Sequence, residues 1–450
     1  MQDRLPKLLP AFALATSKDA SVAAQYERFP YPERNPEDER RRAIGTWLDN
    51  LDILNFRCYK GETPFTRGFR VLVAGGGTGD ATIYLGIQLR HTDAEIVHLD
   101  VSAASIDIAR RRAAIHGLDR IRFLQESLLD LPTLNVGRFH YINCVGVLHH
   151  LTDPDAGLQA LLAVLEDRGA IGLMLYGYYG RMGVYHVQEL LRRIGGDVPD
   201  EEKLHIARDL LARLPATNWF KRGEDLHSDH KAGDAGIYDL FLHSQDRAYR
   251  VPELYEWLVD RHGLNLHFSD VHRGDLPYEP AALVRDENSV ALRRISTLPL
   301  RERQAIGELL GGDITRHVLY ATRHSDREPT YGDSDCVPRI PWETHQPRGI
   351  DFATLIESHG QRRFALQHPP SGLHRVMDPN PLAAGIFREL DGVRSFREIF
   401  RRVRENSMLN AKATTDEELF AAFRPWFDAL ASIERMSLLR AQYPWPPFSP

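Results

Sequence analysis

The sequence has little cysteine and no long apolar run. Cysteine occurs three times in 450 residues, and Cys58, Cys144 and Cys336 are far apart in the chain. This spacing indicates neither a disulfide framework nor a zinc site, and it is typical of a protein in a reducing compartment. No stretch approaches the roughly 20 apolar residues of a membrane-spanning helix. We therefore expect a cytoplasmic protein with no membrane partner and no metal site.

An excess of positive charge is also missing. The formal net charge is −6 at pH 7, which disfavours a dedicated nucleic-acid-binding protein. The short basic run at 110–112 is typical of the solvated face of a helix. Apolar residues make up 43% and charged residues 26% of the chain, as in ordinary globular proteins. A chain of 450 residues predicts two or three domains.

What the sequence does contain is a glycine-rich turn directly after an apolar strand, at residues 70–74. The glycines stand at alternate positions, Gly75, Gly77 and Gly79. Glycine at such positions lets the backbone approach a nucleotide-like ligand, because a Cβ atom would block the approach or the dihedral angles. A second strand ends on Asp100, about twenty residues after this turn, where a mononucleotide-binding half-sheet places a carboxylate for the ribose hydroxyls.

Further strand patterns continue this alternation of strands and helices. They are expected at 121–124, 139–145, 170–176, 264–268 and 317–322. Leucines at helical spacing, at 158, 161, 162 and 165, come before the strand at 170–176. The chain is thus predicted to have an α/β fold.

Four short segments, in this order, carry a resemblance to a known family. They read AGGGTG at 74–79, HLDVS at 98–102, ESLLDLP at 126–132 and NCVGVLHHLTDP at 143–154. This set resembles motifs I to IV of the class I S-adenosylmethionine (SAM) dependent methyltransferases. The resemblance implies a seven-stranded, mostly parallel Rossmann-like sheet with an antiparallel last strand, and SAM as the cofactor. It also implies helical insertions at about 181–250 and 270–312.

The same resemblance implies which residues bind the cofactor. Gly75, Gly77 and Gly79 would let the backbone approach its methionyl and ribose parts, and Asp100 would hold the ribose. Two positions, Ala74 and Ser127, depart from the family pattern. Ala74 stands where many members have an acid for the methionine amine, and we expect Asp80 to substitute for it.

The adenine contact and the transferred methyl involve the ends of the third and fourth strands. Ser127 stands where the family often has an acid for adenine, so a backbone contact from Leu128 is expected beside it. Asn143 occupies the motif IV position, which faces the transferred methyl. Its surroundings lack the Asn/Asp-Pro-Pro-aromatic signature of enzymes that methylate amide or adenine nitrogens.

Two histidines are candidates for acid–base chemistry. Of the neighbours His149 and His150, one is expected to pack under the edge of the sheet and the other to line the site, and His149 is a candidate catalytic residue. His243 is either a core histidine satisfied by hydrogen bonds or the general base.

The segment Gln25–Pro32 reads QYERFPYP. It resembles the QYE…PYP element that precedes the core in a subset of bacterial methyltransferases, some of which act on proteins. This resemblance implies a lid in which Tyr26 and Tyr31 close over the cofactor. The alternative is a surface loop in which both tyrosines are packing anchors.

The domain boundaries follow from changes in composition. We expect an N-terminal helical lid segment at 1–67, a methyltransferase domain at 68–323, a linker at 324–349 and a small domain at 350–450. The last of these contains an LDG…S…EI pattern in which Ser395 and Glu398 form a capping box. The pattern resembles small winged-helix modules, including some that recognise peptides, and the alternative is a generic helical domain.

These patterns together predict a SAM-dependent methyltransferase. The acceptor is expected to be a side-chain nitrogen of a protein or peptide, because of the QYE…PYP resemblance and the additional C-terminal domain. One alternative is an O- or N-methyltransferase for a small metabolite, with the C-terminal domain forming a homodimer. A second is a non-catalytic SAM-binding regulator that contacts DNA, which the negative charge disfavours.

Overall fold

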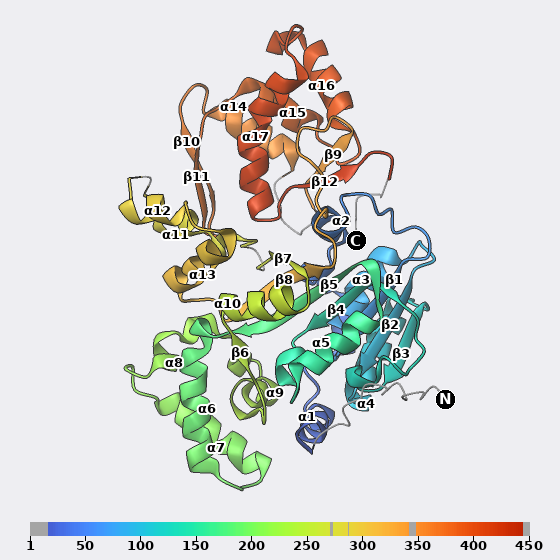
Figure 1. Cartoon of the computed structure of the whole chain (residues 1–450), viewed down its shortest axis with the longest axis vertical. Coiled ribbons are helices and arrows are strands. Elements are labelled where there is room, and N and C mark those ends of the chain that lie inside the picture. The colour runs from blue at the N-terminus through green and yellow to red at the C-terminus, as the bar shows by residue number, and fades with distance from the viewer. Residues whose placement is uncertain (1–16, 271–272, 287, 342–347, 444–450) are drawn as a thin grey trace, which may run out of the picture.

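The computed structural model describes residues 17–270, 273–286, 288–341 and 348–443, and it centres on a mixed β-sheet (Figure 1). The strands of this sheet are β1 (Arg70–Ala74), β2 (Glu95–Asp100), β3 (Ile121–Gln125), β4 (Phe139–Val145), β5 (Leu165–Gly177), β6 (Ala248–Tyr249), β7 (Asn265–Phe268) and β8 (Arg316–Thr322). Their order is β3-β2-β1-β4-β5-β8-β7, and the short β6 pairs with β5 off this path.

Strand direction in this sheet follows the predicted pattern. The pairs β1–β2, β2–β3, β1–β4 and β4–β5 are parallel. In contrast, β8 runs antiparallel to both of its neighbours, β5 and β7. The predicted fold class, a mostly parallel seven-stranded sheet with an antiparallel last strand, is therefore confirmed.

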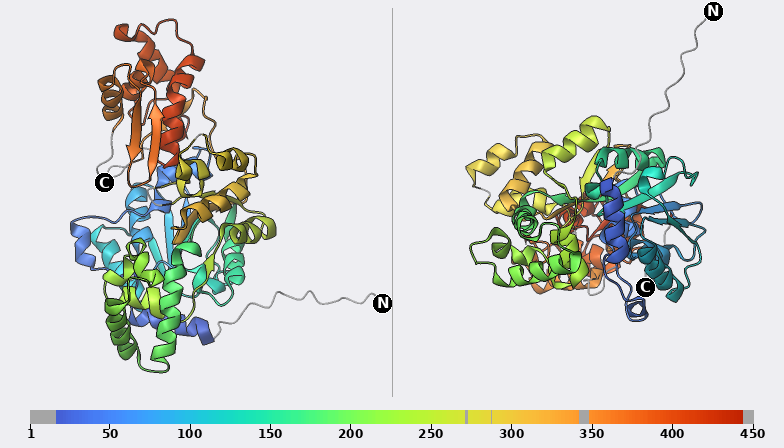
Figure 2. Two further views of the ribbon diagram at one scale, coloured as in Figure 1. Left: turned by 90° about the vertical axis from the view of Figure 1, so that its left-hand side faces the viewer. Right: turned by 90° about the horizontal axis from the view of Figure 1, so that it is seen from below.

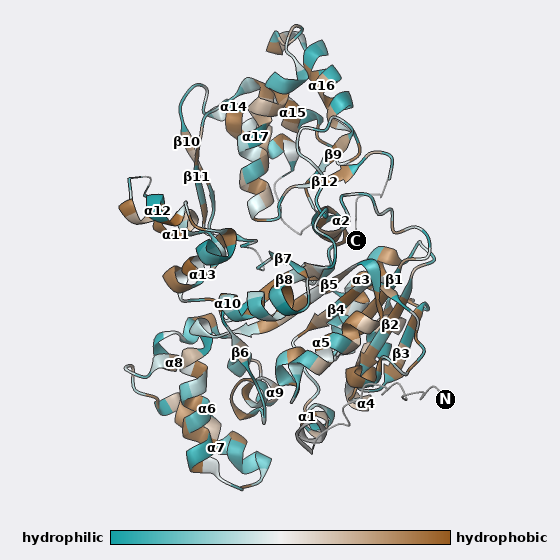
Figure 3. Cartoon of the chain, in the orientation of Figure 1, coloured by the Kyte–Doolittle hydropathy of each residue, from teal (hydrophilic) through white to brown (hydrophobic). Residues whose placement is uncertain are grey.

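Helices cover both faces of the sheet. They are α2 (Leu51–Cys58), α3 (Asp80–Leu89) and α4 (Ala103–Ile115) on one face, and α5 (Pro154–Ala163) and α10 (Val251–Leu254) on the other. Successive residues of a strand point to opposite faces, so Val71 packs with α2 and α3 whereas Leu72 packs with α5 and α10. Figure 3 shows the hydrophobic residues of these strands in brown. Among the described residues, no helix has the length and apolar character that a membrane crossing requires.

A helical insertion follows β5. It comprises α6 (Met182–Gly195), α7 (Asp200–Arg213), α8 (Trp219–Arg222), α9 (Asp234–Ile237) and the π-helical turn η8 (Tyr238–Leu242). Its apolar residues form a core of their own, against which Phe29 packs after α1 (Ser17–Arg28). The N-terminal segment thus bridges the insertion and the sheet. A second insertion, between β7 and β8, holds α11 (Pro280–Val284), α12 (Val290–Ile295) and α13 (Leu300–Gly311).

The C-terminal module lies at the opposite end of the long axis from α6 and α7, as Figures 1 and 2 show. It consists of α14 (Gly349–Ser358), β10 (Phe364–His368), β11 (Leu373–Met377), α15 (Pro381–Glu389), α16 (Phe396–Glu405), α17 (Asp416–Ser432) and β12 (Ser437–Arg440). The predicted capping box at Ser395 and Glu398 is present at the start of α16.

The segment 324–349, predicted as a linker, is more structured than its proline and glycine content indicated. It contains β9 (Cys336–Arg339), which pairs antiparallel with β12. A sequence-distant partner strand therefore orders this segment, and local composition carries no signal of such a partner. Residues 342–347 lie outside the described part of the chain.

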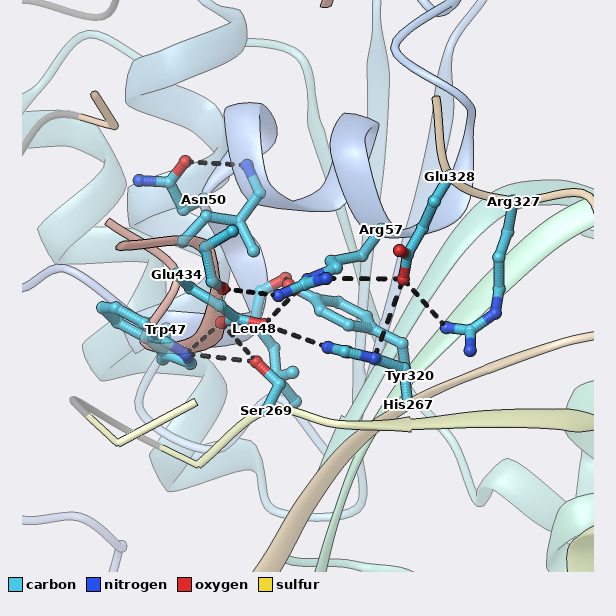
Figure 4. Close-up of polar contacts among 12 residues, drawn as sticks. Trp47, Leu48, Asn50, Arg57, His267, Ser269, Tyr320, Arg327, Glu328 and Glu434 are labelled. Atoms are coloured by element: carbon cyan, nitrogen blue, oxygen red, sulfur yellow. Dashed lines mark hydrogen bonds and ion pairs between the residues drawn. The ribbon is translucent and has the colours of Figure 1, made fainter. Parts of the chain in front are cut away.

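A buried polar network joins the C-terminal module to the core (Figure 4). Its centre is Glu434, which follows α17 and is 1% exposed. The Glu434 carboxylate accepts hydrogen bonds from Trp47 Nε1 at 2.8 Å and Ser269 Oγ at 2.6 Å. Arg57 Nε lies 3.3 Å from its other oxygen and also donates from Nη2 to the carbonyl of Ala431 at 2.8 Å. One carboxylate thus holds together groups from α2, β7 and the segment before α2.

We expect Glu434→Ala to lower the free energy of unfolding by about 3–5 kcal/mol. The variant removes one of the two carboxylates that pair with the buried Arg57, and it leaves Trp47 and Ser269 without this acceptor. Equilibrium denaturation measures this loss. Glu357→Ala is the matched control: its ion pair with Arg388 is exposed, and exposed pairs contribute at most about 1 kcal/mol. Equal losses in the two variants would show that the Glu434 network does not hold the module in place.

Candidate functional site

A cavity of about 780 Å³ opens at the carboxyl ends of β1, β2 and β4 and extends to β5 and β8. The N-terminal segment and the helical insertion form its remaining walls. In open α/β sheets ligands bind at this edge. Of the predicted cofactor residues, all line the cavity except Gly79; those that line it are Gly75, Gly77, Asp80, Asp100, Ser127, Leu128 and Asn143.

The glycine turn is shaped by close contacts on both of its sides. Gly77 has a φ of +51°, and a Cβ atom there would lie 2.6 Å from the backbone carbonyl oxygen of Tyr31. Gly79 has a φ of +102°, and its Cβ would lie 2.8 Å from the side chain of Ala109 on α4. Gly77 therefore permits the approach of the N-terminal segment, whereas Gly79, which was expected to face the cofactor, permits the packing of two helices.

Asp100 stands at the end of β2 and is bound by the glycine turn. Its Oδ2 accepts a hydrogen bond from the Gly77 backbone N–H at 2.7 Å, and its Oδ1 accepts one from Ser102 N–H at 2.9 Å. Burial raises the pKa of this carboxyl, and the backbone hydrogen bonds oppose that effect. Each carboxylate oxygen has a second lone pair, so Asp100 can also accept from a ribose hydroxyl.

Asp80, predicted to reach the methionine amine, is already paired with two guanidinium groups. It binds Arg34 through both oxygens, at 3.0 and 2.7 Å, and Arg112 Nη1 at 2.7 Å. Burial alone would raise the pKa of Asp80, but the hydrogen bonds and charges of the two arginines lower it. Arg34 lines the cavity beside Asp80, which places a cation next to the glycine turn.

Ser127 and Leu128, for which an adenine contact is predicted, line the cavity at the turn after β3. The Ser127 hydroxyl accepts from Leu129 N–H at 3.2 Å and so caps the short turn after β3. Glu126 lines the same wall.

Asn143 sits at the end of β4 and holds a carboxylate that sequence reasoning missed. Its Nδ2 lies 2.9 and 3.0 Å from the two oxygens of Asp49. Asp49 also lines the cavity, and burial raises the pKa of its carboxyl to about 6, against the effect of its hydrogen bonds. Asp49 precedes the core by twenty residues and belongs to no motif, so the sequence carried no signal for it.

Tyr26 and Tyr31 both line the cavity. The segment that carries them is tied to the core, because Ser102 Oγ donates to the carbonyl of Tyr26 at 3.2 Å and Thr78 Oγ1 donates to that of Pro32 at 2.7 Å. This position is compatible with a lid, which stays a prediction.

A polar cluster lies at the insertion side of the cavity. Asp239 Oδ1 accepts from the Tyr26 hydroxyl at 3.0 Å, and Asp239 Oδ2 accepts from the Tyr176 hydroxyl at 3.4 Å. The Tyr26 hydroxyl is also 3.4 Å from His243 Nε2. The ring of His150 stacks on that of His243 at 3.9 Å. Neither Asp239 nor Tyr176 was assigned a role from the sequence.

The two histidines of the LHH sequence take different positions. His150 lines the cavity, whereas His149 does not. The His149 ring is fully buried against that of Tyr176, and neither of its nitrogens has a hydrogen-bond partner. Burial holds its pKa well below the ordinary range, so it is neutral. His149 therefore packs behind the site, and His150 takes the place at the cavity wall.

His243 does not line this cavity, and it contacts two residues that do, Tyr26 and His150. Burial lowers its pKa to about 2, and its Nδ1 accepts from Gln245 N–H at 3.1 Å. Ligand atoms of His150, Asp239 and His243 lie within 4.8 Å of one another, a spacing that a metal ion could use. The Tyr26 hydroxyl contacts Asp239 and His243, and the His150 ring stacks on that of His243.

The cavity fits SAM in three respects. The glycine turn passes close to the cavity without side chains, Asp100 has lone pairs for ribose hydroxyls, and the volume of about 780 Å³ is within the range of ligand pockets. Fold and site together thus have the features of a class I methyltransferase.

Comparisons with known proteins agree. A methyltransferase-domain family matches residues 71–169. An uncharacterized protein of Synechococcus sp. is 31% identical over 328 residues, which cover 72% of this chain and 76% of the relative. A ubiquinone biosynthesis O-methyltransferase of Escherichia coli is 22% identical over 189 residues, or 40% of this chain and 77% of that protein.

The structure of PKMT2 from Rickettsia typhi superimposes with a TM-score of 0.60 at 12% identity, covering 88% of this chain and 76% of the other, and at this identity it shows the fold alone. The same protein in complex with AdoHcy gives a TM-score of 0.58. The chain is a SAM-dependent methyltransferase, as predicted. It belongs to the same family as the Synechococcus protein.

Gly77→Ala should weaken SAM binding at least tenfold, because the new methyl group displaces the Tyr31 carbonyl from the glycine turn. Isothermal titration calorimetry measures the change. Gly117→Ala is the matched control: Gly117 also has a positive φ, +64°, but nothing lies within 4 Å of its added Cβ. If both variants bind SAM as the wild type does, the close approach at Gly77 has no part in the site.

Proposed function

We propose that the enzyme methylates a side-chain nitrogen of a protein or peptide, with the acceptor amine bound at Asp239. The observation that carries this proposal is the buried carboxylate of Asp239 at the cavity wall, which accepts hydrogen bonds from the hydroxyls of Tyr26 and Tyr176. A buried carboxylate attracts an ammonium group. The additional C-terminal module supports an acceptor larger than a metabolite.

The hydrogen bonds around Asp239 have a fixed direction. His243 Nδ1 accepts from a backbone N–H, so neutral His243 carries its proton on Nε2. That N–H points to the Tyr26 oxygen, and the Tyr26 hydroxyl donates in turn to Asp239. Asp239 is thus the accepting end of the chain. His243, a candidate base from the sequence, acts in this arrangement by orienting Tyr26.

Asp239 is therefore assigned as the general base. SAM supplies a methyl group on a sulfonium, and the acceptor nitrogen needs a free lone pair to receive it. Burial raises the pKa of Asp239, partly against the charge of His150, which brings its basicity closer to working pH. Tyr26 and Tyr31 cover the cavity, exclude water and align the acceptor.

A small-metabolite acceptor is the second candidate. The guanidinium of Arg316 lines the same cavity and would bind an acidic or phenolic acceptor. The O-methyltransferases among the relatives also favour it. We further propose that the enzyme is cytoplasmic and forms a homodimer, and that Tyr26 and Tyr31 act as a lid. The three cysteines are free and buried, which is compatible with a reducing compartment.

The acceptor class is tested with radiolabelled SAM and an extract of the source cells. We expect label in the protein fraction, and acid hydrolysis should release N-methylated amino acids. Label that appears only among small molecules would replace this acceptor with a metabolite. The Asp239→Asn variant, added to a parallel extract, measures background labelling.

Asp239→Asn should lower kcat on the order of a hundredfold, because it removes the proton acceptor, and should change SAM affinity by less than about twofold. The wild-type rate should fall as pH is lowered through the raised pKa of Asp239, because the base must be ionised, and the variant should lack this limb. Asp234→Asn, at an exposed ion pair with Arg208, is the control with unchanged activity. A normal kcat in Asp239→Asn would exclude this base.

A further inference from the structure

Asp49 is a buried carboxylate in the cofactor cavity that has no cation beside it. It ends the turn η2 (Trp47–Asp49), is 1% exposed and lines the cavity. Both of its oxygens accept from Asn143 Nδ2. Within the described part of the chain its oxygens form hydrogen bonds but no ion pair. Burying a carboxylate without a countercharge is unfavourable, so this arrangement calls for a positive partner from outside the protein.

The surrounding backbone fixes Asp49 in place. Its carbonyl oxygen accepts from Gln88 Nε2 at 2.7 Å. The carbonyl of Leu48 accepts from the hydroxyls of Tyr141 at 2.9 Å and Tyr320 at 3.0 Å. Helix α3 and strands β4 and β8 thus all hold this turn. The carboxylate is a built feature of the cavity wall and not a surface side chain that happens to fold inward.

The position of Asp49 matches a group that the glycine turn lacks. Asn143 pairs with Val73 in the sheet register, so the carboxylate that Asn143 holds lies at the carboxyl ends of β1 and β4. Ala74, the next residue of β1, provides no acid there. The neighbouring acid Asp80 is neutralised by Arg34 and Arg112. Of these two acids, Asp80 forms ion pairs, whereas Asp49 forms none with any described residue.

We propose that Asp49 binds the α-ammonium group of the methionyl part of SAM, with Asn143 holding the carboxylate in position. Asp49 would then take the role expected of Asp80, from a segment outside the four methyltransferase motifs. Arg34, at the same wall, offers a guanidinium for the α-carboxylate. This assignment rests on the SAM-dependent activity and not on the identity of the acceptor.

Calorimetric titration of the full-length enzyme with two ligands tests the assignment, without any acceptor present. S-adenosylhomocysteine carries the α-ammonium group, whereas 5′-methylthioadenosine keeps the adenosine and the thioether and lacks the amino acid. Asp49→Asn should weaken the first at least tenfold and leave the second within twofold. Equal losses for both ligands, or no loss for the first, would overturn the assignment.

The wild-type enzyme provides a second measurement in case Asp49→Asn does not fold. The analogue of S-adenosylhomocysteine with hydrogen in place of the α-ammonium group should bind at least tenfold more weakly than the parent, and equal affinity would overturn the proposal.

If Asp49→Asn instead keeps its affinity for S-adenosylhomocysteine but raises KM for the acceptor, the ammonium that Asp49 binds belongs to the acceptor, which also overturns the proposal. A failure of the Asp239 proposal would leave these binding results unchanged.

Discussion

The contact between the glycine turn and the N-terminal segment is the constraint on which the site depends. The carbonyl of Tyr31 occupies the space where any side chain at position 77 would stand. This approach brings Tyr26, Tyr31 and Arg34 to the cavity, and it leaves the Gly77 N–H free to bind Asp100. Without it, the end of the sheet would be an open surface, where water would weaken every electrostatic contact.

Electrostatics divides the cavity into regions of different character. Near the glycine turn, Asp80 is balanced by two arginines. Asp239, on the insertion side, and Asp49, beside Asn143, are buried and form no ion pair with a described residue, and burial raises the pKa of both carboxyls. Carboxylates of this kind attract cations or take up protons. Aspartate thus has a structural role at position 80, whereas we propose that it binds a ligand at positions 49 and 239.

The sequence predicted the parts of the molecule that depend on local pattern. Strand periodicity indicated the individual strands, and the spacing from the glycine turn indicated Asp100. The resemblance to class I methyltransferases implied the antiparallel last strand and the motif IV position of Asn143. Residues brought in by tertiary packing were missed. Asp49 lies in a turn that belongs to no motif. The sequence did not show which of His149 and His150 lines the cavity, because adjacent residues differ only in which side of the chain they face. The segment predicted as a linker contains β9. Its partner β12 is about a hundred residues away in the chain, and a local sequence pattern does not reveal a pairing over that distance.

The position of Trp47 has a consequence for how this architecture can change. Trp47 bonds to Glu434 of the C-terminal module, and Asp49 in the cavity is two residues further along the same turn. Replacing the C-terminal module by that of a relative would therefore disturb the cavity wall, unless Glu434 and the residues that contact it were exchanged together. The C-terminal module and the turn before α2 form one structural unit, although nearly four hundred residues separate Trp47 from Glu434. Recombination at the apparent domain boundary would divide this unit.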